Sequence, residues 1–223
     1  MKNIAVVLAG SGAKDGAEIT EAVSLLIALS QAGYGIQCFA PDRLQHHVVN
    51  HLTGEEEKSQ QRNILVEAAR IARGKILPLS QLSAAKFVGL AFGGGFGVAK
   101  NLCNFATEGV EAHIEADIKA VLQDFYRAKK PIAALCISPV LLALFARDAS
   151  LKGVRITLGA DGTPPVQAVK QWGLVHQPCP VTEACIDPQH KFVSAPAYMY
   201  DNASPADIFA SAKALVAGLA TLV

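Results

Sequence analysis

One cysteine stands where a sulfur nucleophile could act. Cys136 follows the apolar run from Pro131 to Leu135, and a helical pattern begins at Val140. Its neighbours two positions away, Ala134 and Ser138, are small, as the sharp strand-to-helix turn of a nucleophile elbow requires. A thiol there lies near the amino end of a helix, whose dipole and free amides favour the thiolate. We therefore expect an exposed thiol of increased acidity, against the alternative of a small apolar residue buried at a strand end.

Two glutamates could carry protons for this thiol. Glu18 and Glu21 lie one helical turn apart at the start of the helical pattern from Glu18 to Gln31. In the usual strand order of open α/β sheets, these glutamates lie on the side of the ligand-binding crevice, where one of them could meet Cys136. A carboxyl group held against a thiolate must be protonated, because two anions in one dry pocket repel each other. The alternative is a favourable placement of acids at a helix amino terminus.

Glycine-rich segments follow two of the expected strands. The segment from Gly93 to Gly97 could direct backbone amides at an oxyanion, since glycine permits close approach. Phosphate binding is the competing hypothesis, but the segment lacks a Gly-Lys-Ser/Thr ending and the acid of a dinucleotide site. The segment from Gly10 to Gly12 lacks the third glycine of the dinucleotide fingerprint. Both are weak nucleotide signals.

Metal binding is not predicted. His47 and His51 could share a helix face, but no third ligand stands near them in the sequence. Cys179 and Cys185 have no Cys-x-x-Cys spacing. The five cysteines are odd in number and scattered, which indicates a reducing compartment, and we expect a cytoplasmic protein.

Composition excludes several classes of function. The 223 residues are 51% apolar and 17% charged, so a disordered chain is not expected. A formal net charge of +1 does not provide the excess of positive charge that binding to nucleic acid requires. No uncharged apolar run reaches the roughly 18 residues that span a bilayer, so no membrane partner is expected.

The elements that must position these residues alternate between strand and helix. Strand patterns occupy Lys2 to Leu8, Tyr34 to Ala40, Phe87 to Phe92, Pro131 to Leu135, Val154 to Leu158 and Phe192 to Ala195. Helical patterns occupy Glu18 to Gln31, Ile64 to Ala72, Ala112 to Ala128, a segment from Val140, and a final helix capped by Ser204 to Asp207. The alternation predicts one three-layer α/β domain over residues 1–223.

At this point the residues carry a family resemblance. The chain resembles the enhancing-lycopene-biosynthesis (ElbB) branch of the ThiJ/PfpI superfamily. The resemblance implies a class I glutamine amidotransferase-like domain, a flavodoxin-like sandwich with a mostly parallel sheet, and a homodimer. The matching segments are Asp15 to Val23, Cys38 to Asp42, Asn50 to Glu55, Gly94 to Leu102, Cys136 to Pro139 and Ala195 to Met199.

The resemblance also implies an activity. It is that of a glyoxalase III-like lyase, which converts glyoxal or a similar small 2-oxoaldehyde to the hydroxy acid without glutathione or any cofactor. Deglycation is a contested interpretation of the same chemistry. A protein of another class is the alternative: a redox-responsive or scaffold protein in which Cys136 is oxidised to sulfinate.

Roles follow the matching positions. The resemblance implies Cys136 as nucleophile, with the amides of Gly95 and Ile137 binding the oxyanion. The acid falls on Glu21 or, if the longer loop shifts the register, on Glu18. We expect substrate contacts from three residues of the loop from Gly93 to Asn101, namely Gly94, Phe96 and Asn101.

Three departures from the branch pattern stand out. The branch usually has Pro-Gly-Gly where this chain has Gly93 to Gly95, and alanine where this chain has Ser138. Many superfamily members supply a histidine after the nucleophile, where this chain has Ile156 to Asp161. A Cys-His-Glu amidotransferase or a triad protease is therefore disfavoured, with His176 as a remote candidate.

Overall fold

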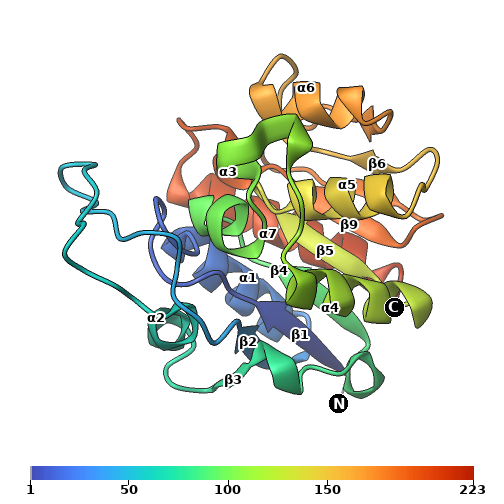
Figure 1. The fold of residues 1–223 in the computed structure, drawn as a ribbon. Helices are drawn as coiled ribbons and strands as arrows, with labels where there is room; N and C mark the ends of the chain where they lie inside the picture. Colours follow the sequence, from blue (N-terminus) through green and yellow to red (C-terminus); the bar gives the residue numbers. More distant parts are fainter. Residues whose placement is uncertain (1) are drawn as a thin grey trace.

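The Val- and Ile-rich runs of the sequence form a seven-stranded sheet in the computed structural model, which describes residues 2–223 (Figure 1). The strand order is β3-β2-β1-β4-β5-β9-β8, and all neighbours are parallel except β8, which runs antiparallel to β9. The strands are β1 (Asn3–Val7), β2 (Gly35–Ala40), β3 (Ile76–Pro78), β4 (Gly89–Phe92), β5 (Ile132–Leu135), β8 (Cys185–Asp187) and β9 (Phe192–Ala195).

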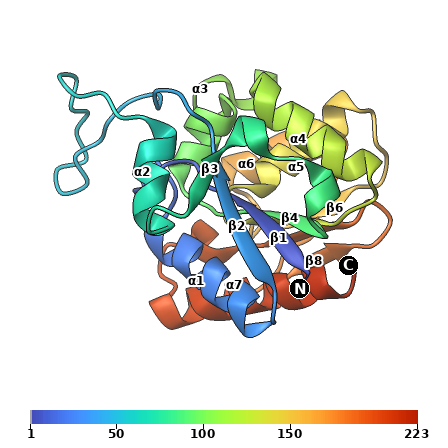
Figure 2. The same cartoon turned by 90° about the horizontal axis from the view of Figure 1, so that it is seen from below.

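Helices cover both faces of this sheet, as Figure 2 shows. One face carries α1 (Ile19–Gln31) and α7 (Pro205–Ala220), and the other carries α4 (Ala116–Arg127) and α5 (Pro139–Asp148). Three shorter helices lie at the periphery: α2 (Ile64–Ile71), α3 (Phe105–Glu108) and α6 (Pro164–Gln171). The predicted three-layer, mostly parallel α/β architecture is confirmed.

Burial explains why the strands read as continuous apolar runs. Residues Ile4 to Val7 of β1 and Ile132 to Leu135 of β5 are at most 1% exposed, because helices cover both sides of a parallel sheet. Helix starts are fixed by side chains: Ser204 and Asp207 form a capping box at α7, and Glu18 caps α1.

Some predicted elements were wrong in place or type. Val154 to Leu158 does not enter the main sheet: its central residues form β6 (Arg155–Ile156), which pairs only with β7 (Val175–His176). The position beside β9 is taken by β8 instead, and the Asp187 carboxylate of β8 accepts the Arg155 amide at 2.9 Å. The helix predicted from Ala112 begins later, at Ala116, because Ile114 forms a β-bridge with Cys103.

Residues 42–63 make an excursion from the sheet rather than a helix. Two antiparallel bridges, Leu44 with Asn63 and Val49 with Glu56, hold it together. It projects from the body of the fold in both views (Figures 1 and 2). The suggestion that His47 and His51 share a helix face is therefore wrong. Among residues 2–223, no helix combines the length and apolar character needed to cross a membrane.

Candidate active site

The strand order brings three loops together at one edge of the sheet. From β1 the chain crosses to β2 on one side, while β4 lies on the other side of β1, so the order reverses there. Ligands of open α/β sheets bind outside the carboxyl ends of strands at such a point. The loops that follow β4 and β5 carry Gly94 and Cys136, and Glu21 lies at the start of α1, directly after the loop that follows β1.

Cys136 occupies a strained turn directly after β5. Its φ of +61° is in the left-handed region, which residues other than glycine rarely adopt. The Cys136 amide donates to the Ala195 carbonyl at 2.9 Å, and the Ser138 amide donates back to Leu135 at 3.0 Å. These bonds hold the sharp turn that the small neighbours indicated. The expectation of an exposed thiol is wrong, however, since Cys136 is only 7% exposed.

Glu21 is the acid that lies against the thiol. It is fully buried in the first turn of α1, and its Oε1 accepts the Tyr198 amide at 3.0 Å. Within the described residues Oε2 has no conventional hydrogen-bond partner, and the Cys136 thiol is the polar group that it faces. Burial raises the pKa of Glu21 from 4.5 to about 8, and the Cys136 thiol and the Tyr198 amide oppose this shift.

Glu18 has a different position. As the N-cap of α1, it accepts the Glu21 amide through Oε2 at 2.6 Å. This bond fixes the start of the helix and hence the direction of the Glu21 side chain. The structure thus places Glu21 against Cys136 and places Glu18 at the pocket wall.

The predicted increase in the acidity of Cys136 is wrong. Burial raises the pKa of the thiol well above its ordinary value, and the Glu21 carboxyl raises it further. The amides of Gly95 and Ile137 are directed at the sulfur and act in the opposite direction, lowering the pKa. The loss of hydration on burial therefore outweighs the effect of the helix amino terminus on this thiol. The resting pair is therefore a neutral thiol beside a largely neutral carboxyl group.

Gly94 allows the Glu21 and Cys136 side chains to approach each other. A Cβ on Gly94 would lie 2.0 Å from Glu21 Oε2 and 2.5 Å from Cys136 Cβ, so no side chain fits between them. Gly95 follows with a φ of +103°, which glycine adopts without strain. The buried Ser138 hydroxyl donates to the Gly93 carbonyl and ties this loop to the cysteine turn.

A cavity of about 460 Å³ opens onto the Cys136 side chain. Phe96 is 58% exposed and forms part of its wall. Tyr198 and Met199 enter from the turn after β9, and Thr163 and Pro165 enter from the start of α6. None of these four residues was predicted from the sequence to have a role in the site. The rule that loops after strand ends form the site could have indicated Tyr198 and Met199, since they follow the predicted strand Phe192 to Ala195.

Asn101 does not contact this cavity, so its predicted role in substrate binding is wrong. Its side-chain amide donates to the carbonyls of Ala9 and Asp15 at 3.0 and 2.9 Å, and its Oδ1 accepts the His46 amide at 2.8 Å. These hydrogen bonds of the Asn101 side chain all join it to backbone groups of other segments. Asn101 positions the loop after β1 and does not face the pocket.

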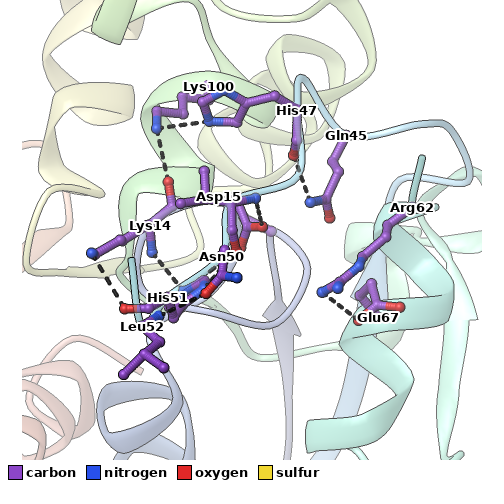
Figure 3. Close-up of polar contacts among 12 residues, drawn as sticks. Lys14, Asp15, Gln45, His47, Asn50, His51, Leu52, Arg62, Glu67 and Lys100 are labelled. Carbon is purple, nitrogen blue, oxygen red and sulfur yellow. Dashed lines mark hydrogen bonds and ion pairs between the residues drawn. The ribbon is translucent and has the colours of Figure 1, made fainter. Parts of the chain in front are cut away.

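The histidines of the excursion hold the same loop from outside (Figure 3). The Lys14 amide donates to His51 Nε2 at 3.1 Å, while His51 Nδ1 lies 3.0 Å from the Val49 carbonyl. Lys100 Nζ lies 3.0 Å from His47 Nε2 and 2.8 Å from the Lys14 carbonyl (Figure 3). Within residues 2–223, no cluster of three or more His, Cys, Asp or Glu side chains could hold a metal ion.

His176 does not reach the cysteine. Its buried side chain accepts the Leu158 amide at Nε2 and lies 3.2 Å from Asp161 through Nδ1. It is not among the residues that line the Cys136 cavity. Among the described residues no histidine lines the Cys136 cavity, and the acid beside the Cys136 thiol is Glu21.

A flavodoxin-like sheet, a cysteine on a strained turn after β5, and a buried acid on α1 define a class 1 glutamine amidotransferase-like protein with the ThiJ/PfpI fold. No family model matches the chain. It is 45% identical over 204 residues to the ES1 protein homolog, mitochondrial, of Rattus norvegicus, covering 88% of this chain and 75% of that protein. The chain belongs to this family of ES1, glutamine amidotransferase-like class 1 proteins.

Other relatives agree with this assignment. Human glutamine amidotransferase-like class 1 domain-containing protein 3, mitochondrial, is 42% identical over 90% of this chain and 76% of its own length. An isoprenoid biosynthesis protein with an amidotransferase-like domain from Ehrlichia chaffeensis has a TM-score of 0.91 and 35% identity, covering 100% of this chain and 99% of that one. Glyoxalase III from Candida albicans shares the fold, with a TM-score of 0.60 and 15% identity over 97% of each chain.

Proposed function

We propose that this protein is a glutathione-independent glyoxalase, which converts glyoxal or a similar small 2-oxoaldehyde to the hydroxy acid. One observation carries the proposal. The Glu21 carboxyl group and the amides of Gly95 and Ile137 all lie at the sulfur of Cys136, and Cys136 lines a cavity. A nucleophile, a proton carrier and two oxyanion donors are what this reaction requires. The fold shared with a glyoxalase III supports the proposal.

The reaction begins with addition of the thiol to one carbonyl. The Cys136 sulfur bonds to the aldehyde carbon, and the thiol proton ends on the carbonyl oxygen, giving a hemithioacetal. The amides of Gly95 and Ile137 stabilise the oxygen while it carries negative charge. Because the resting thiol has a raised pKa, we expect the thiolate to form during the attack rather than before it.

Proton transfer by Glu21 completes the conversion. Its carboxylate takes the C–H proton of the hemithioacetal carbon, and the neighbouring carbon is protonated through an enediol. The first carbon is oxidised to a thioester while the second is reduced to an alcohol, so no external oxidant is needed. Water then hydrolyses the thioester, which releases the hydroxy acid and restores the thiol. A Glu21 pKa of about 8 keeps both of its protonation states accessible near neutral pH.

The test is turnover of glyoxal by the purified chain without glutathione. We expect Cys136→Ala to abolish turnover and Glu21→Gln to lower kcat by about two to four orders of magnitude. Cys38→Ala is the matched control, because Cys38 is also a buried free cysteine but lies on β2. Equal rates in the wild type and Cys136→Ala would contradict the proposal.

The second candidate is a redox-responsive or scaffold protein with Cys136 as sulfinate. It is favoured by the amides of Gly95 and Ile137 at the sulfur, which could also donate to sulfinate oxygens. In this chemistry two molecules of peroxide oxidise the thiol to sulfinic acid and are reduced to water. Mass spectrometry after stoichiometric peroxide distinguishes the candidates. Oxidation of Cys136 in a chain without glyoxal turnover would support this candidate.

The remaining features belong to the same proposal. We assign the chain to the ElbB branch, without a cofactor, and expect it to form a homodimer that light scattering would detect. Neither nucleic acid nor membrane is proposed as a partner. The five free cysteines support a reducing compartment. The cytoplasm provides one, as does the mitochondrial interior that the names of the relatives indicate for those proteins.

A further inference from the structure

The Cys136 cavity is much larger than a two-carbon aldehyde requires. Its volume of about 460 Å³ is within the range of pockets that bind drug-sized ligands, whereas glyoxal has only four non-hydrogen atoms. Much of its wall is apolar, formed by Phe96, Ile137, Pro165 and Met199. Glyoxal would leave most of this wall in contact with water.

A second cavity lies directly behind part of this wall. It has a volume of about 500 Å³, and Phe96, Ile137 and Pro165 line both cavities. None of its lining residues, all of which lie within residues 2–223, carries an ionisable side chain. The apolar part of the Cys136 cavity wall is therefore shared with a second cavity whose lining is uncharged.

The charges around the Cys136 cavity have one sign. Its lining includes the carboxyl groups of Glu18, Glu21 and Asp201, and no Lys, Arg or His side chain among the described residues lines it. The Lys100 ammonium group lies near the rim, 5.4 Å from the Phe96 ring centre, but it is bound to the Lys14 carbonyl. An anionic ligand would approach Glu18 and Asp201 without a compensating cation.

Phe96 is the residue best placed to recognise an apolar group. Its side chain is 58% exposed, so a ligand in the cavity can reach the ring. Its ring belongs to the wall that both cavities share. An aromatic or branched apolar group of a ligand could pack on it and so lose its contact with water.

Building on the proposed glyoxalase activity, we propose that the preferred substrates are 2-oxoaldehydes that carry an uncharged apolar or aromatic group. Phe96 binds this group, and the carboxylates of Glu18 and Asp201 select against anionic substrates. Phe96 is then a specificity residue, while the chemistry stays with Cys136 and Glu21.

The first experiment compares kcat/KM for glyoxal, phenylglyoxal and 4-carboxyphenylglyoxal. We expect phenylglyoxal to exceed glyoxal by about tenfold or more, because a phenyl group is buried. We expect the carboxylated analogue to fall at least about threefold below phenylglyoxal. Phe96→Ala should reduce the preference for the phenyl group. Asp201→Asn should raise kcat/KM for the carboxylated analogue towards that for phenylglyoxal.

Phe209→Ala is the matched control for Phe96→Ala. Phe209 also has a lysine above its ring, with Lys213 Nζ 5.8 Å from the ring centre, but it lies on α7 and does not line the cavity. Its removal should leave the ratio of phenylglyoxal to glyoxal unchanged. Equal kcat/KM for phenylglyoxal and glyoxal in the wild type would overturn the size selection, and equal kcat/KM for the two aryl substrates would overturn the charge selection.

A second experiment separates this inference from the proposed function. Alkylation of Cys136 by iodoacetamide and iodoacetate, which differ in charge, reports on the pocket without turnover. We expect the rate with iodoacetamide divided by the rate with iodoacetate to be larger for Cys136 than for free cysteine. We also expect acetophenone to slow alkylation in the wild type but not in Phe96→Ala. If no oxoaldehyde is turned over, the glyoxalase function fails, and the absence of both alkylation effects would overturn the inference itself.

Discussion

The Glu21 carboxyl group and the Cys136 side chain meet across Gly94, with both within 2.5 Å of the point where a Cβ of residue 94 would lie. Three segments that follow three neighbouring strands thus converge on a volume smaller than a methyl group. The absence of a side chain at one position decides whether acid and nucleophile can touch.

Gly94→Ala should therefore separate the pair. The added methyl group would overlap Glu21 Oε2 and force the buried carboxyl or the cysteine turn to move, so we expect a loss of turnover of at least a hundredfold. Gly93→Ala is the control, because a Cβ there would meet only ordinary contacts at 3.5 Å and beyond. Comparable activity in the two variants would contradict this account.

Glu21→Gln should stabilise the protein in a pH-dependent way. In the unfolded chain the carboxyl group ionises near 4.5, but in the folded protein it ionises near 8, so wild-type stability falls as the pH rises between these values. Glutamine resembles the neutral acid and does not titrate. The Tm of the variant minus that of the wild type should be near zero at pH 4.5, grow to several degrees by pH 8, and then level off. A difference that does not change with pH would contradict the raised pKa.

The alkylation of Cys136 should be slow at neutral pH. Burial and Glu21 raise the pKa of its thiol, so we expect the rate with iodoacetamide at pH 7 to lie below that of free cysteine and to keep rising beyond pH 9. Glu21→Gln removes the negative charge and should increase the rate between pH 8 and 9. Peptide mapping by mass spectrometry measures the alkylation of Cys136 separately from that of the other cysteines. A rate plateau below pH 7 would show an acidic thiol instead.

Ser138→Ala should loosen the contact between two active-site loops. The Ser138 hydroxyl is buried, and its hydrogen bond to the Gly93 carbonyl is lost in the variant, which leaves that carbonyl without this donor. We expect the free energy of unfolding to fall by about 1 to 2 kcal/mol, measured by urea unfolding. Turnover should fall too, because Gly94 and Gly95 follow directly in the loop. An unchanged urea midpoint would show that the bond contributes nothing.

Thr163→Val should stabilise the protein. Thr163 is the N-cap residue of α6 but makes no side-chain cap hydrogen bond, and its buried hydroxyl has no partner within the described residues. Replacing it with a methyl group should raise the free energy of unfolding by about 1 kcal/mol. Thr157→Val is the contrasting variant and should be destabilising, because the Thr157 hydroxyl accepts the Gly159 amide at 3.2 Å. Destabilisation in both variants would contradict this reasoning.

The parts of the fold that sequence could predict are those with long, regular patterns. The buried strands near Ile4 and Ile132 and the capped helix after Ser204 were found because apolar runs and cap residues are local signals. The short strands β3, β7 and β8 were missed, since two or three residues carry no period. Their pairing depends on neighbours that are distant in the sequence.

The candidate site was predictable in its residue types but not in its electrostatics. Small neighbours indicated the turn at Cys136, yet the pKa of its thiol depends on burial and on Glu21 and Gly95, which only folding brings to the sulfur. The choice between Glu18 and Glu21 was likewise a question of geometry. Two departures from the branch pattern prove to be related, because the Ser138 hydroxyl donates to the carbonyl of Gly93. A hydrogen bond restrains a loop that a proline would otherwise stiffen.

The hydrogen bond from the Tyr198 amide to Glu21 Oε1 joins opposite ends of the polypeptide. During synthesis on the ribosome, Glu21, Gly94 and Cys136 all emerge before Tyr198 does. A nascent chain or a C-terminally truncated fragment thus holds every reactive group yet lacks the amide that orients the acid.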